Sequence, residues 1–294
     1  MNTQFPNIAI LGRHDDSRLA EPMRLLARYL TKVGINVLAS DSLQLELDVT
    51  RMPEADLCAA ADLIIAIGGD GTMLYASRLA RESGTPILGI NRGRLGFLAD
   101  VTPDEMINSV DQVLQGDYTR DSRILLQARL HTDSGEERTA FALNDVVLQR
   151  SETGRMVDFS TRIAGQYVNT HSGDGLIIST PTGSTAYALS CGGPIIEPQL
   201  NAVAVVPICP HTLTDRPLVI SAEQAIEVTL LERDDTLAEI TVDGFPMGQI
   251  RPTDRLVVSA AAQRIILVHP PSYDFFGILR SKLFWGRDSR NRAN

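Results

Sequence analysis

The pattern of hydrophobic and polar positions divides the chain into two parts. In the first 118 residues, short apolar runs alternate with segments whose apolar residues recur every three to four positions. The runs predict buried strands and the periodic segments predict amphipathic helices. Strands that alternate with helices indicate a parallel, doubly wound sheet. Expected strands span residues 7–13, 35–39, 63–67 and 86–91, and expected helices span 18–33, 53–61 and 103–114, with a further helix starting near residue 72.

The pattern changes near Asp117. The following segments are short, rich in Val, Ile and Leu, and bounded by turn residues, which is typical of a mainly antiparallel β domain. From Ser272 the tail is helical again, and its apolar stripe favours packing on the first part. We therefore expect two domains, residues 1–118 with 271–294 and residues 119–270. The expected strands of the second domain are 124–130, 141–148, 157–163, 176–180, 203–208, 226–231, 237–242, 256–259 and 265–269, with one helix over 182–190.

Composition narrows the class of protein. Hydrophobic residues make up 44% of the chain, so a large core can form, and the net charge of -9 argues against a general nucleic-acid binder. The three cysteines are widely separated and odd in number, which predicts reduced thiols. The N-terminus lacks the features of a signal peptide, and no apolar run approaches the length of a membrane span. A cytoplasmic protein without a membrane partner is expected.

The strand expected at residues 63–67 ends in Gly68-Gly69-Asp70-Gly71-Thr72. A buried strand, a glycine turn and a helix start form a phosphate-binding junction, in which Thr72 is predicted to cap the helix. A carboxylate repels phosphate, so phosphate binding alone does not explain Asp70. Its presence indicates transfer of a phosphoryl group to a hydroxyl. Asp70 would either accept the proton of that hydroxyl or hold the metal ion that shields the phosphate charge. The alternative is an ordinary tight turn, because Asp-Gly is a common turn pair.

A second candidate stretch has four hydroxyls around one glycine. Thr180, Thr182, Ser184 and Thr185 flank Gly183, where an expected strand enters an expected helix. Hydroxyls together with the N–H groups of a helix start suit a ligand that has ribose, phosphate or adenine edges. Ordinary helix capping is the alternative.

Polar residues elsewhere are also candidates. Asn144 and Asp145 lie inside an expected apolar strand, although strands disfavour both types. Either they contact a ligand, or the strand has a local turn or bulge, and both interpretations stay open. Arg92 and Arg94 follow a strand among glycines, and like Arg155 they either hold phosphates or are solvated loop charges. The chain has no P-loop motif and no Gly-x-Gly-x-x-Gly after its first strand.

Together these stretches resemble the motifs of NAD kinases. The resemblance covers nearly the whole chain and rests on residues 68–72, 144–145, 175–187, 210–218 and 243–244. It implies a Rossmann-like N-terminal domain and a β-rich C-terminal domain, with the C-terminal helix returning to the first domain. It also implies a kinase that transfers the γ-phosphoryl group of ATP to the 2′-hydroxyl of the adenosine ribose of NAD to form NADP. Mg²⁺ or another divalent cation and a homodimer or homotetramer are expected.

The resemblance also implies roles for individual residues. Asp70 would be the general base of a site between the two domains, and the other residues of the glycine turn would line it. Metal ligands are not identified by the motifs. In bacterial relatives, arginine and glutamine are common where this chain has Ser172 and Phe245. The residues expected to bind the nucleotides are Gly68, Gly69, Gly71, Thr72, Asn144, Asp145, Arg155, Asp174, Thr185, Ala186, Tyr187, Ala188, Leu189 and Ser190.

Two other functions are compatible with parts of the sequence. A kinase of a lipid or sugar phosphate hydroxyl would share the glycine turn but would not explain residues 180–187. A nucleotide sensor without catalysis would have little need for Asp70. The motifs allow ATP or polyphosphate as donor, NAD or NADH as acceptor, and feedback by NADPH.

Overall fold

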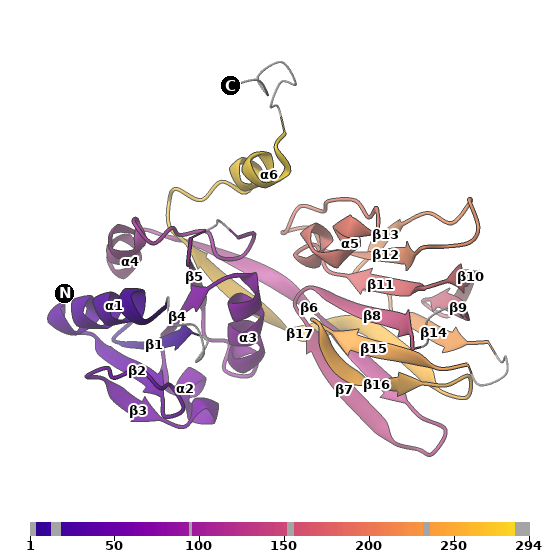
Figure 1. Cartoon of the computed structure of the whole chain (residues 1–294), viewed down its shortest axis with the longest axis horizontal. Helices are drawn as coiled ribbons and strands as arrows, with labels where there is room; N and C mark the ends of the chain where they lie inside the picture. The colour runs from indigo at the N-terminus through magenta and orange to yellow at the C-terminus, as the bar shows by residue number, and fades with distance from the viewer. Residues whose placement is uncertain (1–3, 13–18, 94–95, 152–155, 232–235, 286–294) are drawn as a thin grey trace. The chain divides into compact units, whose positions relative to one another are not determined.

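The computed structural model describes residues 4–12, 19–93, 96–151, 156–231 and 236–285. The backbone separates into two compact units (Figure 1). Unit 1 consists of Met1–Asp121 with Ile265–Asn294, and unit 2 consists of Ser122–Arg264. Each unit has its own buried hydrophobic core.

Unit 1 is built on a parallel sheet, as the alternating pattern predicted. Its central strands β4 (Leu63–Gly68) and β5 (Ile87–Asn91) are rich in Ile and Leu and fully buried, which is typical of parallel strands covered on both faces. The strands are β1 (Asn7–Gly12), β2 (Asn36–Ser40), β3 (Thr50–Met52), β4 (Leu63–Gly68), β5 (Ile87–Asn91) and the end of β17 (Arg255–His269), in the order β17-β5-β4-β1-β2-β3. All neighbouring pairs are parallel.

Helices cover both faces of this sheet. Figure 1 shows α1 (Ala20–Lys32) and α4 (Met106–Leu114) on one face, and α2 (Glu54–Ala60) and α3 (Asp70–Ala80) on the other. The Tyr29 hydroxyl of α1 donates to Asp111 Oδ1 of α4 at 2.9 Å. The tail forms α6 (Phe275–Leu283), which buries Ile278 and Leu279 within unit 1. Within the described part of the chain, no helix combines the length and the apolar character that crossing a membrane requires.

Unit 2 is a β-rich unit of antiparallel strands, again as predicted. One sheet has the order β13-β12-β11-β8-β15-β16 and the other contains β10, β9, β14 and the first part of β17, with β6 and β7 paired beside it. Apolar side chains of both sheets form a shared core that includes Leu148, Phe159 and Ile240, and a smaller apolar cluster contains Ile177 and Val206. The bounds are β6 (Thr119–His131), β7 (Glu137–Ala142), β8 (Asp145–Arg150), β9 (Val157–Ile163), β10 (Gln166–Gly173), β11 (Gly175–Ser179), β12 (Ala202–Ile208), β13 (Leu218–Ser221), β14 (Ile226–Leu230), β15 (Ala238–Val242) and β16 (Phe245–Ile250).

Three segments differ from the prediction. The strand expected at 141–148 is interrupted at Leu143 and Asn144, which separate β7 from β8. The helix expected at 182–190 is a 3₁₀ turn, η2 (Gly183–Thr185), followed by the short α5 (Tyr187–Ser190), because the ψ of −129° at Ala186 is not helical. The strands expected at 256–259 and 265–269 are one strand, β17. The strands that the pattern missed, β3, β10, β13 and β16, have few buried residues and therefore lack a strong apolar signal.

Candidate active site

The glycine turn of unit 1 is the strand-to-helix junction that the sequence predicted. β4 ends at Gly68, Gly69 is the N-cap of α3, and Asp70 is the first residue of the helix. Thr72 does not cap the helix, so that expectation was wrong. Its side chain is buried inside the first turn, against Gly68, where an added Cβ would lie 2.1 Å from Thr72 Oγ1. Gly68 is therefore required by its packing against Thr72.

Two backbone amides hold the carboxylate of Asp70. The N–H of Phe97 donates to Oδ2 at 3.1 Å and the N–H of Leu98 donates to Oδ1 at 2.9 Å. Gly96 allows this approach, because a Cβ there would lie 2.2 Å from Asp70 Oδ1. A carboxylate offers about four acceptor positions, so two remain for a ligand hydroxyl. The half-buried carboxylate is thus fixed in direction and still able to accept a proton.

The remaining glycines of the turn leave open space. A Cβ added at Gly69 or Gly71 would meet no atom within 4 Å. The first N–H groups of a helix lack acceptors within the helix and carry partial positive charge, so this open space suits an anion. The junction therefore combines a proton acceptor with a phosphate-binding helix end.

In unit 2, the interruption between β7 and β8 is held by a hairpin tip. Asp243 and Gly244 form the two-residue turn between β15 and β16, with φ values of 49° and 79°. Asp243 Oδ2 accepts the N–H of Leu143 at 2.8 Å, and Oδ1 accepts the N–H groups of Asn144 at 2.7 Å and Asp145 at 3.1 Å. The local turn that the sequence left open at Asn144 and Asp145 is present. No polar role for Asp243 was predicted, although its Asp-Gly pair between two strands signals a hairpin.

The hydroxyl-rich stretch packs directly on this interruption. The Thr180 hydroxyl donates to the carbonyl oxygen of Leu143 at 2.5 Å, and the Thr180 N–H donates to the carbonyl oxygen of Asn144 at 2.9 Å. A Cβ added at Gly183 would lie 2.2 Å from that Asn144 oxygen. The structure thus brings Asn144 and Asp145 together with the start of η2.

All four hydroxyls of this stretch are hydrogen-bonded within the fold. Thr180 is bonded as described, and Thr182 Oγ1 accepts from Arg123 Nη1 at 3.1 Å. Ser184 Oγ donates to the carbonyl oxygen of Pro181 at 2.6 Å and accepts the N–H of Ile196 at 2.9 Å. All three are buried, whereas Thr185 is half-buried. The Thr185 hydroxyl donates to the carbonyl oxygen of Thr182 at 3.3 Å, and Thr185 is the least buried of the four residues.

The residues of α5 divide into core and surface. Ala188 is fully buried against Ile177 and Val206 of the sheet, so its side chain is part of the core. Tyr187 and Ser190 are exposed, and Ala186 and Leu189 are half-buried. A ligand beside α5 would thus meet a phenol and a hydroxyl over an apolar base.

Asp174 lies at the opposite end of β11 from Ser179. Its carboxylate pairs with Arg150, with 3.2 Å between Asp174 Oδ1 and Arg150 Nε. Arg150 was not predicted as a site residue, although it ends the same strand that begins with Asp145. Arg155, which was predicted, lies outside the described residues.

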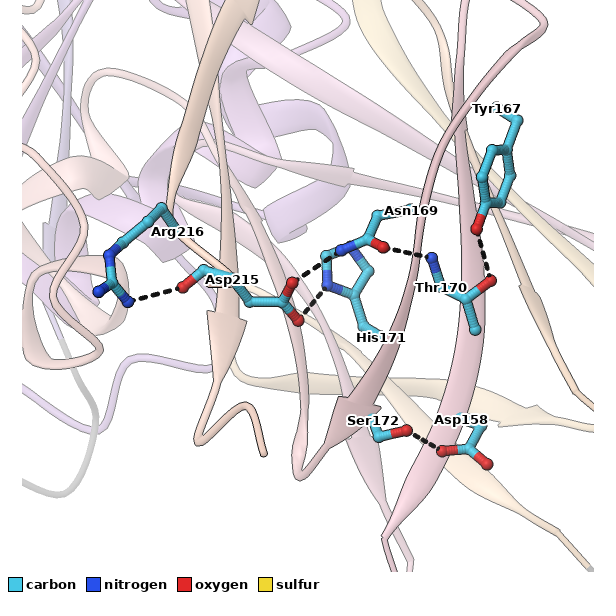
Figure 2. Close-up of polar contacts among 8 residues, drawn as sticks. All are labelled: Asp158, Tyr167, Asn169, Thr170, His171, Ser172, Asp215 and Arg216. Carbon is cyan, nitrogen blue, oxygen red and sulfur yellow. Dashed lines mark hydrogen bonds and ion pairs between the residues drawn. The ribbon is translucent and has the colours of Figure 1, made fainter. Parts of the chain in front are cut away.

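Figure 2 shows the polar contacts of β10, which leads into Asp174. The hydroxyl of Ser172 donates a hydrogen bond to Asp158 Oδ1. His171 Nδ1 lies 3.0 Å from Asp215 Oδ2, and Asn169 Nδ2 donates to Asp215 Oδ1 at 2.7 Å. These side chains fasten the segment after β12 to β10, so His171 has a structural role.

Burial changes the acid–base behaviour of Asp145. Its side chain is almost fully buried, and burial together with the negative charge of Asp243 raises its pKa from 3.8 to about 7. A carboxyl group with this pKa changes charge near neutral pH, which is frequent at functional sites. Among the described residues, no three His, Cys, Asp or Glu side chains are grouped so that they could hold a metal ion.

The fold and these residues define a class: a nucleotide-binding phosphotransferase with a glycine-rich strand-to-helix junction in an α/β unit and a β-rich second unit. Residues 8–118 match the family model described as ATP-NAD kinase N-terminal domain, and residues 143–269 match the ATP-NAD kinase C-terminal domain. The chain belongs to the ATP-NAD kinase family.

Individual NAD kinases are similar in sequence to this chain over almost its whole length. It is 40% identical over 290 residues to the NAD kinase of Thiobacillus denitrificans, covering 98% of this chain and 99% of that protein. It is 39% identical over 293 residues to the NAD kinase of Nitrosococcus oceani, with coverage of 98% and 99%.

Two solved structures share the fold at 24% identity. The yeast NADH kinase complexed with NADH has a TM-score of 0.89, covering 98% of this chain and 89% of that one. An NAD kinase from Archaeoglobus fulgidus in complex with ATP has a TM-score of 0.72, with coverage of 94% and 99%.

The pKa of Asp145 predicts a pH-dependent effect on stability. Because the folded-state pKa is raised, the folded protein holds the proton more tightly, so stability is lost as the pH rises through about 7. Asp145→Asn cannot ionise and should raise the unfolding temperature relative to the natural protein at about pH 8, but much less at about pH 4. Calorimetry at both pH values measures this. Glu239→Gln, on the exposed face of β15, is the control and should show no such difference. An equal effect of Asp145→Asn at both pH values would contradict the prediction.

The contact between Gly96 and Asp70 predicts a loss of turnover. In Gly96→Ala the new Cβ would displace the carboxylate, and misplacing a reacting group by about 1 Å costs on the order of 10²-fold in rate. Steady-state kinetics gives kcat, and circular dichroism checks the fold. Gly277→Ala is the matched control: its Cβ would lie 2.6 Å from Asp274 Oδ2, but Asp274 is exposed and can move aside. Natural turnover in Gly96→Ala would show that the position of this carboxylate is unimportant.

Proposed function

We propose that this protein transfers the γ-phosphoryl group of ATP to the 2′-hydroxyl of the adenosine ribose of NAD, which forms NADP and ADP. The observation that carries the proposal is the carboxylate of Asp70, held by two backbone amides at the N-terminus of α3 beside open glycines. Membership of the ATP-NAD kinase family supports it, as do relatives named NAD kinase that match over almost their whole length.

Asp70 is the general base of the proposed reaction. The 2′-oxygen attacks the γ-phosphorus, the bond from that phosphorus to the β,γ-bridging oxygen breaks, and the hydroxyl proton passes to Asp70. The amides of Phe97 and Leu98 orient the carboxylate. The N–H groups of the α3 terminus and of the glycine turn stabilise the negative charge of the transferring group.

Unit 2 supplies the proposed contacts to NAD. Asn144 and Asp145 offer an amide and a carboxyl group to ribose hydroxyls, and the exposed Tyr187 and Ser190 offer hydroxyls beside α5. Asp174, held by Arg150, adds a further acceptor. The other residues of the proposed NAD site are Arg155, Thr185, Ala186, Ala188 and Leu189, of which Ala188 contributes through its backbone.

ATP enters this proposal as its magnesium complex, and the ion shields the phosphate charge during transfer. Resemblance to the family supports a divalent cation, a homodimer or homotetramer, and action in the cytoplasm.

The decisive experiment incubates purified protein with ATP, Mg²⁺ and NAD and measures NADP with an NADP-specific dehydrogenase. Parallel reactions replace ATP by polyphosphate and NAD by NADH. NADP formation supports the proposal. NAD binding without turnover would instead identify a nucleotide sensor, and phosphorylation of only a lipid or sugar phosphate would identify a different kinase.

Replacing the base should remove turnover without removing binding. Asp70→Asn keeps the shape of the side chain but cannot accept the proton, so kcat should fall by about 10²–10⁴-fold while the Kd for NAD is nearly unchanged. Initial rates and a calorimetric titration measure the two quantities. Asp62→Asn is the control, because Asp62 also accepts a backbone N–H, from Asn7 at 2.8 Å, at the other end of β4. If Asp70→Asn retains most of its turnover, Asp70 is not the base.

A further inference from the structure

Three consecutive backbone amides converge on one carboxylate in unit 2. The N–H groups of Leu143, Asn144 and Asp145 all donate to Asp243, at distances between 2.7 and 3.1 Å. Asp243 also donates its own N–H to the carbonyl oxygen of Asp145 at 3.0 Å. The first two amides lie in the interruption between β7 and β8, so strand pairing does not provide their acceptors. Buried amides without acceptors destabilise a fold, and Asp243 removes this penalty.

The turn alone does not explain an aspartate at this position. The two-residue turn at Asp243 and Gly244 needs positive φ at both residues, which glycine and asparagine also adopt. Only a carboxylate offers two oxygens that accept three N–H groups and no hydrogen that would oppose them. The need to accept the N–H groups of residues 143–145, rather than the geometry of the hairpin, therefore explains an aspartate at position 243.

The other side of the same segment is fixed as well. Thr180 bonds the carbonyl oxygens of Leu143 and Asn144, and Gly183 packs on the Asn144 backbone. The N–H of Asn144 is held by Asp243 and its carbonyl group by Thr180, so the direction of its side chain is set from both sides. Of the two residues that hold this segment, Asp243 and Thr180, only Asp243 carries a charge.

We propose that Asp243 is a positioning residue for NAD binding, whose carboxylate holds the backbone of residues 143–145 so that the Asn144 and Asp145 side chains face the dinucleotide. The inference rests on the proposed roles of Asn144 and Asp145 as NAD contacts. Asp243 itself does not touch the substrate in this proposal.

Asp243 also affects the pKa of Asp145, an effect that a residue with only a structural role would not have. Asp243 is the charged group that acts on Asp145, and its charge adds to burial in raising the pKa of Asp145 to about 7. The ionised form of Asp145 accepts hydrogen bonds from ribose hydroxyls, so the KM for NAD should fall as the pH rises through that value. Removing the charge at position 243 lowers the pKa of Asp145 and moves this dependence to lower pH.

Asp243→Asn tests the proposal by steady-state kinetics across the pH range around 7. We expect the KM for NAD to rise about tenfold to a hundredfold, the range of a lost hydrogen bond to a charged group, with kcat nearly unchanged. The pH dependence of KM should shift to lower pH. Asp243→Gly keeps a turn-compatible residue without the carboxylate and should raise KM in the same way, which covers the case that the asparagine variant does not fold.

Asp254→Asn is the matched control. Asp254 is a buried aspartate of unit 2 whose carboxylate also accepts two backbone amides, from Asp133 at 2.9 Å and Arg251 at 2.8 Å. This variant should be destabilised but should keep the natural KM and pH profile. Equal increases in KM for the variants at 243 and 254 would overturn the proposal, and so would an unchanged KM at 243.

Amide hydrogen exchange without NAD measures the clamp independently of substrate. The amides of residues 143–145 should exchange faster in Asp243→Asn than in the natural protein, and at the natural rate in Asp254→Asn. If the amides of residues 143–145 exchange at the natural rate in Asp243→Asn, the proposal is overturned. If Asn144→Ala and Asp145→Asn leave the KM for NAD unchanged while exchange responds as expected, the proposed NAD contacts fail, and Asp243 is a structural residue only.

Discussion

The hydrogen bond from a backbone amide to a carboxylate organises the candidate residues of both units. In unit 1 the amides of Phe97 and Leu98 hold Asp70, and in unit 2 Asp243 holds the amides of residues 143–145. Charge-assisted bonds of this kind are shorter and stronger than neutral ones. They also have a direction, so each fixes either a reactive carboxylate or the backbone that presents one.

These bonds depend on the absence of side chains at two glycines. A Cβ at Gly96 would enter the space of the Asp70 carboxylate, and a Cβ at Gly183 would enter that of the Asn144 carbonyl oxygen. Close approach of backbone to a polar group is a use of glycine that is separate from turn formation. The two positions therefore restrict the chain as strongly as the carboxylates do, although neither contacts a substrate in the proposed mechanism.

Unit 2 has an ionisable side chain, that of Asp145, close to its core. Asp145 begins the buried strand β8, and burial with the charge of Asp243 brings its pKa to about 7. A buried ionisable group lowers stability when it is charged, and such a cost is common where binding needs that group. The three N–H groups that bond Asp243 lower the pKa of that residue and so oppose the effect of its own burial.

Apolar periodicity alone determined the fold class, the parallel sheet of unit 1 and most strands of unit 2, because buried strands and amphipathic helices have their own spacing in sequence. The motif around Asp70 likewise located the strand-to-helix junction. Only the tertiary structure showed that the side chains of Thr72, Thr180, Thr182 and Ser184 are buried, and that Asn144 interrupts a strand. It alone connected Asp243 with residues about a hundred positions earlier. The reason is physical: local spacing encodes which face of an element is buried, whereas the partner of a buried amide or hydroxyl is chosen by segments that meet only when the chain has folded.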